Sequence, residues 1–174
     1  MPFAYYQRLT RAQQRVYRRS DEITAISLPG SRDLRVLVDA LADALGKEDR
    51  LAIQVMADRL LLGMTTSLGA PPLRAHVLAV RPSHHWGELH GLYTPGERGQ
   101  PSRATVWMRT AQRRQVVRFR TFLRTLLHEL CHHLDYELLR LPDSFHTQGF
   151  YKRESSLLWQ LLGERPPGEV ARHV

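Results

Sequence analysis

Residues 126–137 read LLHELCHHLDYE, a stretch with two histidines four positions apart and a glutamate directly after the first. The stretch lies inside residues 116–139, where apolar side chains recur at the three- and four-residue spacing of a helix. Residues four apart lie above one another on a helix, so His128 and His132 can both reach one metal ion. The apolar stripe is on the other side, so packing it on a core turns both histidines toward a cleft or solvent. The stretch therefore predicts a helix that carries a candidate metal site.

The side chain of the glutamate between the two histidines points in a different direction from the same helix. Glu129 lies about 100° around the axis from His128, because a helix has about 3.6 residues per turn. It need not bind the metal, but it can reach a water molecule held there. Such a carboxylate is the general base of zinc hydrolysis, and histidine nitrogens are usual zinc ligands. The pattern predicts Zn²⁺ as the cofactor and Glu129 as the catalytic residue; a solvated polar helix face is the alternative.

A hydrolytic zinc site needs a third protein ligand and an open position for water. His146 is the first candidate, because Pro142 ends the helix and a chain that reverses there can return to the metal. Glu154, about two turns further along, is the rival, and this choice stays open. Asp135 is interpreted either as an acceptor that orients an imidazole or as a simple surface carboxylate.

Other metal-binding side chains in the chain receive a structural interpretation. His133 points away from the face of the two motif histidines, and Cys131 is interpreted as a buried, inert thiol. His84, His85 and His90, in PSHHWGELH, have no helical register. A plain loop or strand is favoured there over a second metal site.

The order of predicted elements is helices first, then strands, then helices again. The first part has apolar residues at helical spacing, and the middle part has short, partly β-branched runs separated by turn residues. The predicted segments are helices 4–23, 31–45 and from 47 to near SLGAPP (67–72), strands 74–80, 87–94 and 104–110, and helices 116–139 and 149–163.

The composition limits the classes of protein to which this chain can belong. The chain has 174 residues and 43% hydrophobic content, which predicts one globular domain, helical over 1–68 with a core over 72–163. No apolar run approaches the roughly 20 residues of a membrane-spanning helix, and the N-terminus lacks the apolar region of a secretory signal. The single cysteine excludes an internal disulfide framework and a multi-cysteine zinc ribbon. We expect a cytoplasmic protein without a membrane partner.

The formal net charge is +8, nearly all of it from arginine. A basic surface favours nucleic acid or acidic partners. The arginines are densest in 8–19 and 109–124, but they are not interleaved with stacking aromatics as in single-strand binders. Nucleic-acid binding and a compositional bias, with the charge solvated on helix faces, both stay open.

Two short motifs resemble one known family. HELCH (128–132) followed by HTQGF (146–150) resembles the SprT-like zinc metallopeptidases. In these, H-E-x-x-H is followed by a histidine with an aromatic residue four positions on, at the head of another helix. The order HGLYT, turn, ATVWM and motif helix is similar to a minimal zincin, so the resemblance covers roughly residues 88–162. The cysteine-rich zinc ribbon of many SprT-like domains has no counterpart, and residues 1–68 match no part of that family.

The resemblance implies an α+β, zincin-like fold with N-terminal helices, a small sheet of about three strands, an active-site helix and a C-terminal helix. It implies ligand roles for His128, His132 and His146 and the base role for Glu129. It also implies a protein or peptide substrate, held by main-chain pairing at a sheet edge.

The expected function is therefore zinc-dependent hydrolysis of peptide bonds. Tyr93, Arg109 and Tyr151 are candidates for stabilising the oxyanion. The alternative is a non-enzymatic protein in which zinc only stabilises the fold and the basic surface binds nucleic acid. A closed site with four protein ligands would favour that alternative, because catalysis needs an open position.

Overall fold

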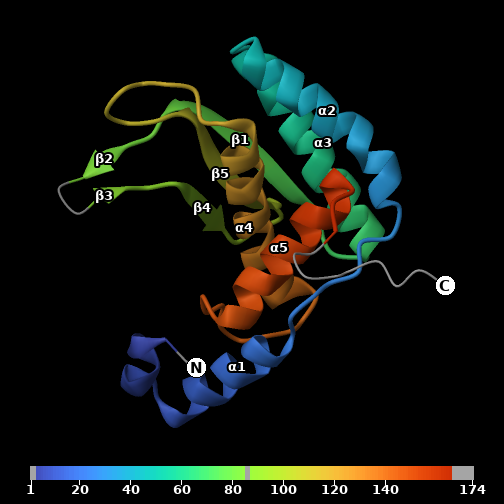
Figure 1. The fold of residues 1–174 in the computed structure, drawn as a ribbon. Helices are drawn as coiled ribbons and strands as arrows, with labels where there is room; N and C mark the ends of the chain where they lie inside the picture. Colours follow the sequence, from blue (N-terminus) through green and yellow to red (C-terminus); the bar gives the residue numbers. More distant parts are fainter. Residues whose placement is uncertain (1–2, 85–86, 166–174) are drawn as a thin grey trace.

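The structure is a computed structural model that describes residues 3–84 and 87–165 (Figure 1). It has an α+β architecture with a small three-stranded mixed sheet, which confirms the predicted class. The elements in chain order are the 3₁₀ helix η1 (Ala4–Arg8), α1 (Arg11–Glu22), α2 (Ser31–Gly46), α3 (Arg50–Leu68), β1 (Leu73–Val80), β2 (Ser83–His84), β3 (Gly87–Glu88), β4 (Gly91–Thr94), β5 (Ser102–Arg109), α4 (Phe119–Glu137) and α5 (Gln148–Leu162).

The main sheet has the strand order β1-β5-β4. β1 runs parallel to β5 and β4 runs antiparallel to it, so β1 and β4 are the two edge strands. Helix α3 covers the β1 edge: Gln54 donates to the Ala75 carbonyl at 2.9 Å and accepts from the Val77 N–H at 2.7 Å. Asp58 accepts from the Ala75 N–H at 3.0 Å. An unpaired edge strand can pair with a further strand. Helix α3 covers the edge strand β1, and β4 forms the other edge of the sheet.

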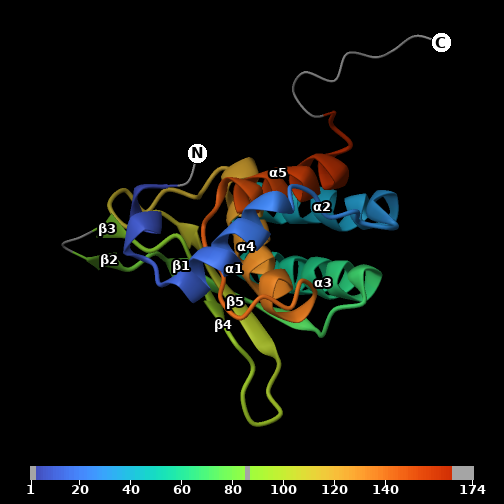
Figure 2. The ribbon, with the colours of Figure 1, turned by 90° about the horizontal axis from the view of Figure 1, so that it is seen from below.

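The helices pack into one core with the sheet. α4 lies against β4 and β5, α3 lies along β1, and α5 lies between α4 and α2 (Figure 1). Figure 2 shows α1 beside α5 and the β4–β5 connection extending away from the helices. One cluster of buried apolar side chains reaches from Ile26 to Leu161, so α2 and α3 share a core with the main sheet, α4 and α5.

The first predicted helix, 4–23, is two elements in the structure. The chain is a 3₁₀ helix over Ala4–Arg8 and turns at Leu9 before α1 begins. Thr10 is the N-cap of α1, and its side chain and that of Gln13 form a reciprocal capping box. This local pairing satisfies free N–H groups at a helix start, which is why the prediction of a continuous helix is wrong.

Two other boundaries differ because backbone groups find strand partners. The predicted strand 87–94 is interrupted: β3 pairs with the short β2, whereas β4 pairs with β5. The motif helix begins at Phe119, because Val116 forms an isolated antiparallel bridge with Arg109. β4 is consequently short and lies directly beside α4.

Candidate metal centre

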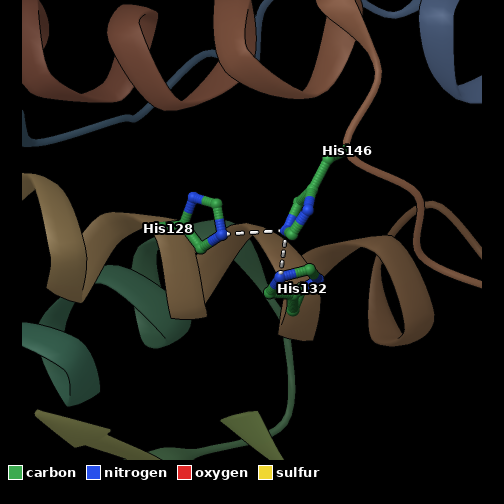
Figure 3. A group of neighbouring side chains, drawn as sticks. All are labelled: His128, His132 and His146. Atoms are coloured by element: carbon green, nitrogen blue, oxygen red, sulfur yellow. Dashed lines mark hydrogen bonds between the residues drawn. The ribbon is translucent and has the colours of Figure 1, made fainter. Parts of the chain in front are cut away.

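Three imidazoles meet at one point beside α4 (Figure 3). His128 and His132 lie one turn apart on α4, and His146 comes from the connection to α5. The Nε2 atom of His146 is 3.0 Å from Nε2 of His128 and 3.0 Å from Nε2 of His132. The ligand atoms of all three lie within 4.8 Å of one another, so these histidines can hold one metal ion.

His128 is oriented by Glu154, the residue that competed with His146 as third ligand. Oε2 of Glu154 is 2.9 Å from Nδ1 of His128, and its Oε1 accepts from Arg124 at 2.8 Å. Glu154 is buried, and its carboxylate lies behind the imidazole. The structure therefore brings His146 to the other two imidazoles and places Glu154 where it fixes the ring and its tautomer.

His132 is oriented through a serine. Ser144 donates its hydroxyl hydrogen to Asp135 at 2.8 Å and lies 2.8 Å from Nδ1 of His132. A serine hydroxyl has one hydrogen, so Nδ1–H of His132 must be the donor in the second bond. Both α4 imidazoles thus present a lone pair at Nε2, which is the form that binds a metal. No sequence pattern indicated Ser144, because a short polar residue in a connection is common.

Asp135 is completely buried, so its interpretation as a surface carboxylate is wrong. Burial raises the pKa of Asp135, whereas the Arg153 guanidinium and the Ser144 hydroxyl oppose that rise. Arg153 is also fully buried and donates to Asp135 at 2.8 Å. The same guanidinium donates to the carbonyls of Ser20 and Ile23, each at 2.6 Å, at the end of α1. A single buried cation therefore links α1, α4 and α5 behind the site.

The N-terminal segment also contacts the third histidine. The Tyr5 hydroxyl donates to the His146 carbonyl at 2.9 Å. Burial, with smaller effects of nearby Tyr17 and Tyr151, raises the pKa of Tyr5 to about 12, so the hydroxyl keeps its proton at physiological pH. A residue of η1 thus holds the backbone of His146.

Phe150 supports all three rings from behind. Its ring centroid is 4.9 Å from that of His128, 4.8 Å from that of His132 and 5.2 Å from that of His146. Phe150 is fully buried in the first turn of α5. Its position four residues after His146 therefore has a packing role, because the aromatic face fixes the three imidazoles.

Two of the three imidazoles, those of His132 and His146, have lowered pKa values in the metal-free protein. Burial and the neighbouring His128 and His146 lower the pKa of His132 to about 3. Burial and His128 also lower the pKa of His146, against the attraction of Glu154. Neutral imidazole is the metal-binding form, so these surroundings favour metal at neutral pH.

Glu129 lies beside this group in a nearly water-free position, 5% exposed. Burial raises its pKa to about 7, while His128 and the Tyr93 backbone N–H oppose the rise. A carboxylate with a pKa near 7 is suited to take and return a proton at physiological pH. Glu129 and His128 also line a cleft of ≈ 520 Å³ with residues 88–91, so a ligand can reach them.

The space for this carboxylate comes from a glycine of β4. A Cβ added at Gly91 would lie 2.9 Å from Cδ of Glu129 and 2.9 Å from Cγ2 of Thr125. Both distances are shorter than ordinary contacts between heavy atoms. Gly91 was not among the predicted site residues, because its importance depends on how β4 approaches α4.

The raised pKa of Glu129 predicts the pH response of the metal-free protein. Between the ordinary value of 4.5 and about 7, the folded chain holds a proton that the unfolded chain has lost. This group therefore lowers stability as pH rises through that range. Glu129→Gln cannot ionise, so we expect it to raise the free energy of unfolding of the metal-free protein at pH 8 by about 3 kcal/mol.

Denaturant unfolding of both metal-free proteins at pH 4 and pH 8 measures this difference. The gain should be near zero at pH 4, where the carboxyl is protonated in both states. Equal stability at pH 8 would show that the carboxylate of Glu129 is solvated.

Two of the three candidates for oxyanion stabilisation lie beside the histidines, and the Tyr93 ring is 6.5 Å from that of His132. The Tyr151 ring is 6.1 Å from that of His128 and 5.9 Å from that of His146, and it lines the cleft. The Tyr93 hydroxyl instead donates to Ser102 at 3.3 Å.

Arg109, the third oxyanion candidate, is engaged elsewhere. It forms an ion pair with Glu48 and donates to the Arg114 carbonyl at 3.1 Å. It lines none of the clefts beside the three histidines. The structure therefore leaves Tyr151 as the candidate.

The structural interpretations of His133 and Cys131 agree with their surroundings. His133 is fully buried, with its Nε2 2.8 Å from the Pro71 carbonyl oxygen. Cys131 is fully buried too, and burial raises the pKa of its thiol well above the ordinary value. A thiol in this setting is unreactive.

Among the side chains that the structure describes, His90 belongs to no second metal-binding group. His90 is exposed, the backbone of His84 belongs to β2, and His85 lies outside the described residues.

Comparisons of the chain with protein-family models, with curated proteins and with solved structures found no match. Within the part of the chain that the structure describes, no helix combines the length and apolar character needed to cross a membrane.

Proposed function

We propose that this protein is a zinc-dependent metallopeptidase with a zincin-like fold. The observation that carries the proposal is the meeting of three imidazoles beside a buried carboxylate at an open cleft. His128, His132 and His146 are the ligands, and Glu129 is the general base.

The donor set fits a catalytic zinc ion. Zinc favours histidine nitrogens, and its catalytic sites have three protein ligands with a further position left open. In the residues that the structure describes, no fourth histidine, cysteine or acidic side chain joins the group. That number favours a catalytic site over the closed structural site of the alternative. When bound, zinc lowers the pKa of water toward about 7 and polarises the substrate carbonyl.

The proton is handled by Glu129. In the proposed reaction, its carboxylate would accept the proton of the attacking water and return it to the leaving amine nitrogen. The Tyr93 N–H and the space at Gly91 hold the carboxylate in place. The Tyr151 hydroxyl stabilises the oxyanion.

The substrate of this proposal is an extended peptide. β4 pairs with β5 on one side, and its other edge adjoins the cleft through Gly91. An extended peptide adds to such an edge by main-chain hydrogen bonds. The protected edge at β1 leaves β4 as the place for this pairing in the main sheet.

The test is metal analysis combined with digestion of an unfolded protein. We expect one zinc per chain and slow digestion of casein that a chelator abolishes and added zinc restores. Undiminished digestion after complete metal removal would contradict the proposal, and so would zinc-loaded protein that cleaves neither casein nor a mixed peptide pool.

Gly91→Ala is expected to reduce hydrolysis on the order of tenfold, because displaced catalytic groups lose rate steeply. The added methyl group pushes the Glu129 carboxylate aside, and the atoms nearest to it belong to Glu129 and Thr125. Zinc content should stay at the wild-type level, and casein digestion measures the rate.

Gly46→Ala is the matched control, because a Cβ at the end of α2 meets nothing within 4 Å. Wild-type activity in both variants would show that the position of Glu129 does not depend on Gly91.

A further inference from the structure

A second cleft, of ≈ 510 Å³, is lined by His146, one of the three histidines of the candidate metal centre. It is lined by residues of η1 and its flank, together with His146 and Tyr151. Tyr151 also lines the cleft that contains Glu129. The two clefts therefore meet at one tyrosine beside the candidate metal, and an extended chain that crosses the metal can enter both.

The lining of this second cleft is largely aromatic. Phe3 is 38% exposed and Tyr151 is 40% exposed, although both are large apolar side chains. Their ring centroids are 6.2 Å apart in an edge-to-face arrangement, and Phe3 stacks on Tyr5 at 6.3 Å. Exposed aromatic rings that surround a concave space bind a further apolar group well, because burial removes all of them from water.

The charge on this cleft is positive. Arg8 is its one charged lining side chain, and within the described residues it forms no ion pair. The positive charge of this guanidinium would repel a lysine or arginine side chain of a ligand. It would not repel an apolar or aromatic side chain.

We propose that this second cleft is a specificity subsite that binds one aromatic or large aliphatic side chain of the peptide, close to the bond that is cut. The inference rests on the proposed metallopeptidase function for the reaction, but the binding preference can be measured without hydrolysis. It gives the N-terminal segment a role in substrate choice, since η1 supplies one wall.

The test uses full-length, zinc-loaded Glu129→Gln protein, which binds peptide without cutting it. The probes are dye-labelled decapeptides of alanine and serine that carry one phenylalanine, or alanine, lysine or glutamate in its place. Fluorescence anisotropy gives each dissociation constant. We expect the phenylalanine peptide to bind about tenfold more tightly than the alanine peptide, the scale for burying one aromatic side chain. The lysine peptide should bind no better than alanine.

Phe3→Ala in the same background is expected to reduce that preference to about threefold or less, because one aromatic wall is lost. Leu51→Ala is the control: Leu51 is 71% exposed on α3 and lines neither cleft. Equal binding of the phenylalanine and alanine peptides would overturn the inference, as would a preference that Phe3→Ala leaves unchanged. Tightest binding of the glutamate peptide, lost in Arg8→Ala, would make the cleft an anion site instead.

The two proposals can fail separately. Wild-type protein that hydrolyses nothing, while the Phe3-dependent preference persists, would contradict the peptidase and keep the subsite. Hydrolysis of casein at bonds with no enrichment of aromatic or large aliphatic neighbours would contradict the subsite and keep the peptidase.

Discussion

Glu129→Gln is expected to reduce casein hydrolysis by about 100-fold or more, the scale of general-base catalysis, with zinc content unchanged. Glutamine has the size and hydrogen-bonding capacity of glutamate, but it cannot accept the proton. Glu129 is buried beside Gly91. It does not belong to the group of three histidines that can hold a metal ion. Rate and zinc content, measured on the same preparation, separate catalysis from metal binding.

Glu137→Gln is the matched control, because Glu137 lies on the same helix but outside the cleft. Loss of zinc from Glu129→Gln would make Glu129 a ligand. Full activity with full zinc would contradict the general-base role of Glu129, and the catalytic interpretation of HELCH would then be wrong.

Replacing any one of the three histidines is expected to abolish tight zinc binding. His128→Ala, His132→Ala and His146→Ala each remove one of the three nitrogens that meet at the site. Elemental analysis after dialysis should find zinc near one equivalent in wild type and only a small fraction in each variant. A full equivalent of zinc in all three variants would place the metal elsewhere.

Two further variants sharpen this measurement. His90→Ala should keep its zinc, because His90 is exposed and outside the group. Glu154→Gln should weaken zinc binding by about 10- to 100-fold without abolishing it, as expected for a residue that orients a ligand. A loss as complete as that in His128→Ala would make Glu154 a ligand.

Local spacing was enough to predict the part of the site that lies on one helix. The four-residue interval between His128 and His132 places both on one face, whatever the rest of the chain does. The same interval rule placed Glu129 to one side of them. The return of His146 was predicted from the break at Pro142, but spacing alone did not choose it over Glu154.

The surroundings of the site depended on contacts between distant segments. The sequence was equally compatible with Asp135 as a surface carboxylate. In the structure Asp135 is buried against Arg153 of α5, and the same guanidinium donates to the backbone at the end of α1. Ser144 acquires its role only when the α4–α5 connection folds back over His132. Helix periodicity contains no information about such partners, because they come from other elements.

The sequence by itself determined the motif helix, the pair of imidazoles on it and the α+β class, since each follows from the spacing of residues along one segment. Only the tertiary structure decided the state of Glu129, because its pKa near 7 comes from burial between α4 and β4. It also decided that residues 3–8 form a wall beside His146. Burial, electrostatics and cleft shape are sums over neighbours in space, and those neighbours are distant in the chain.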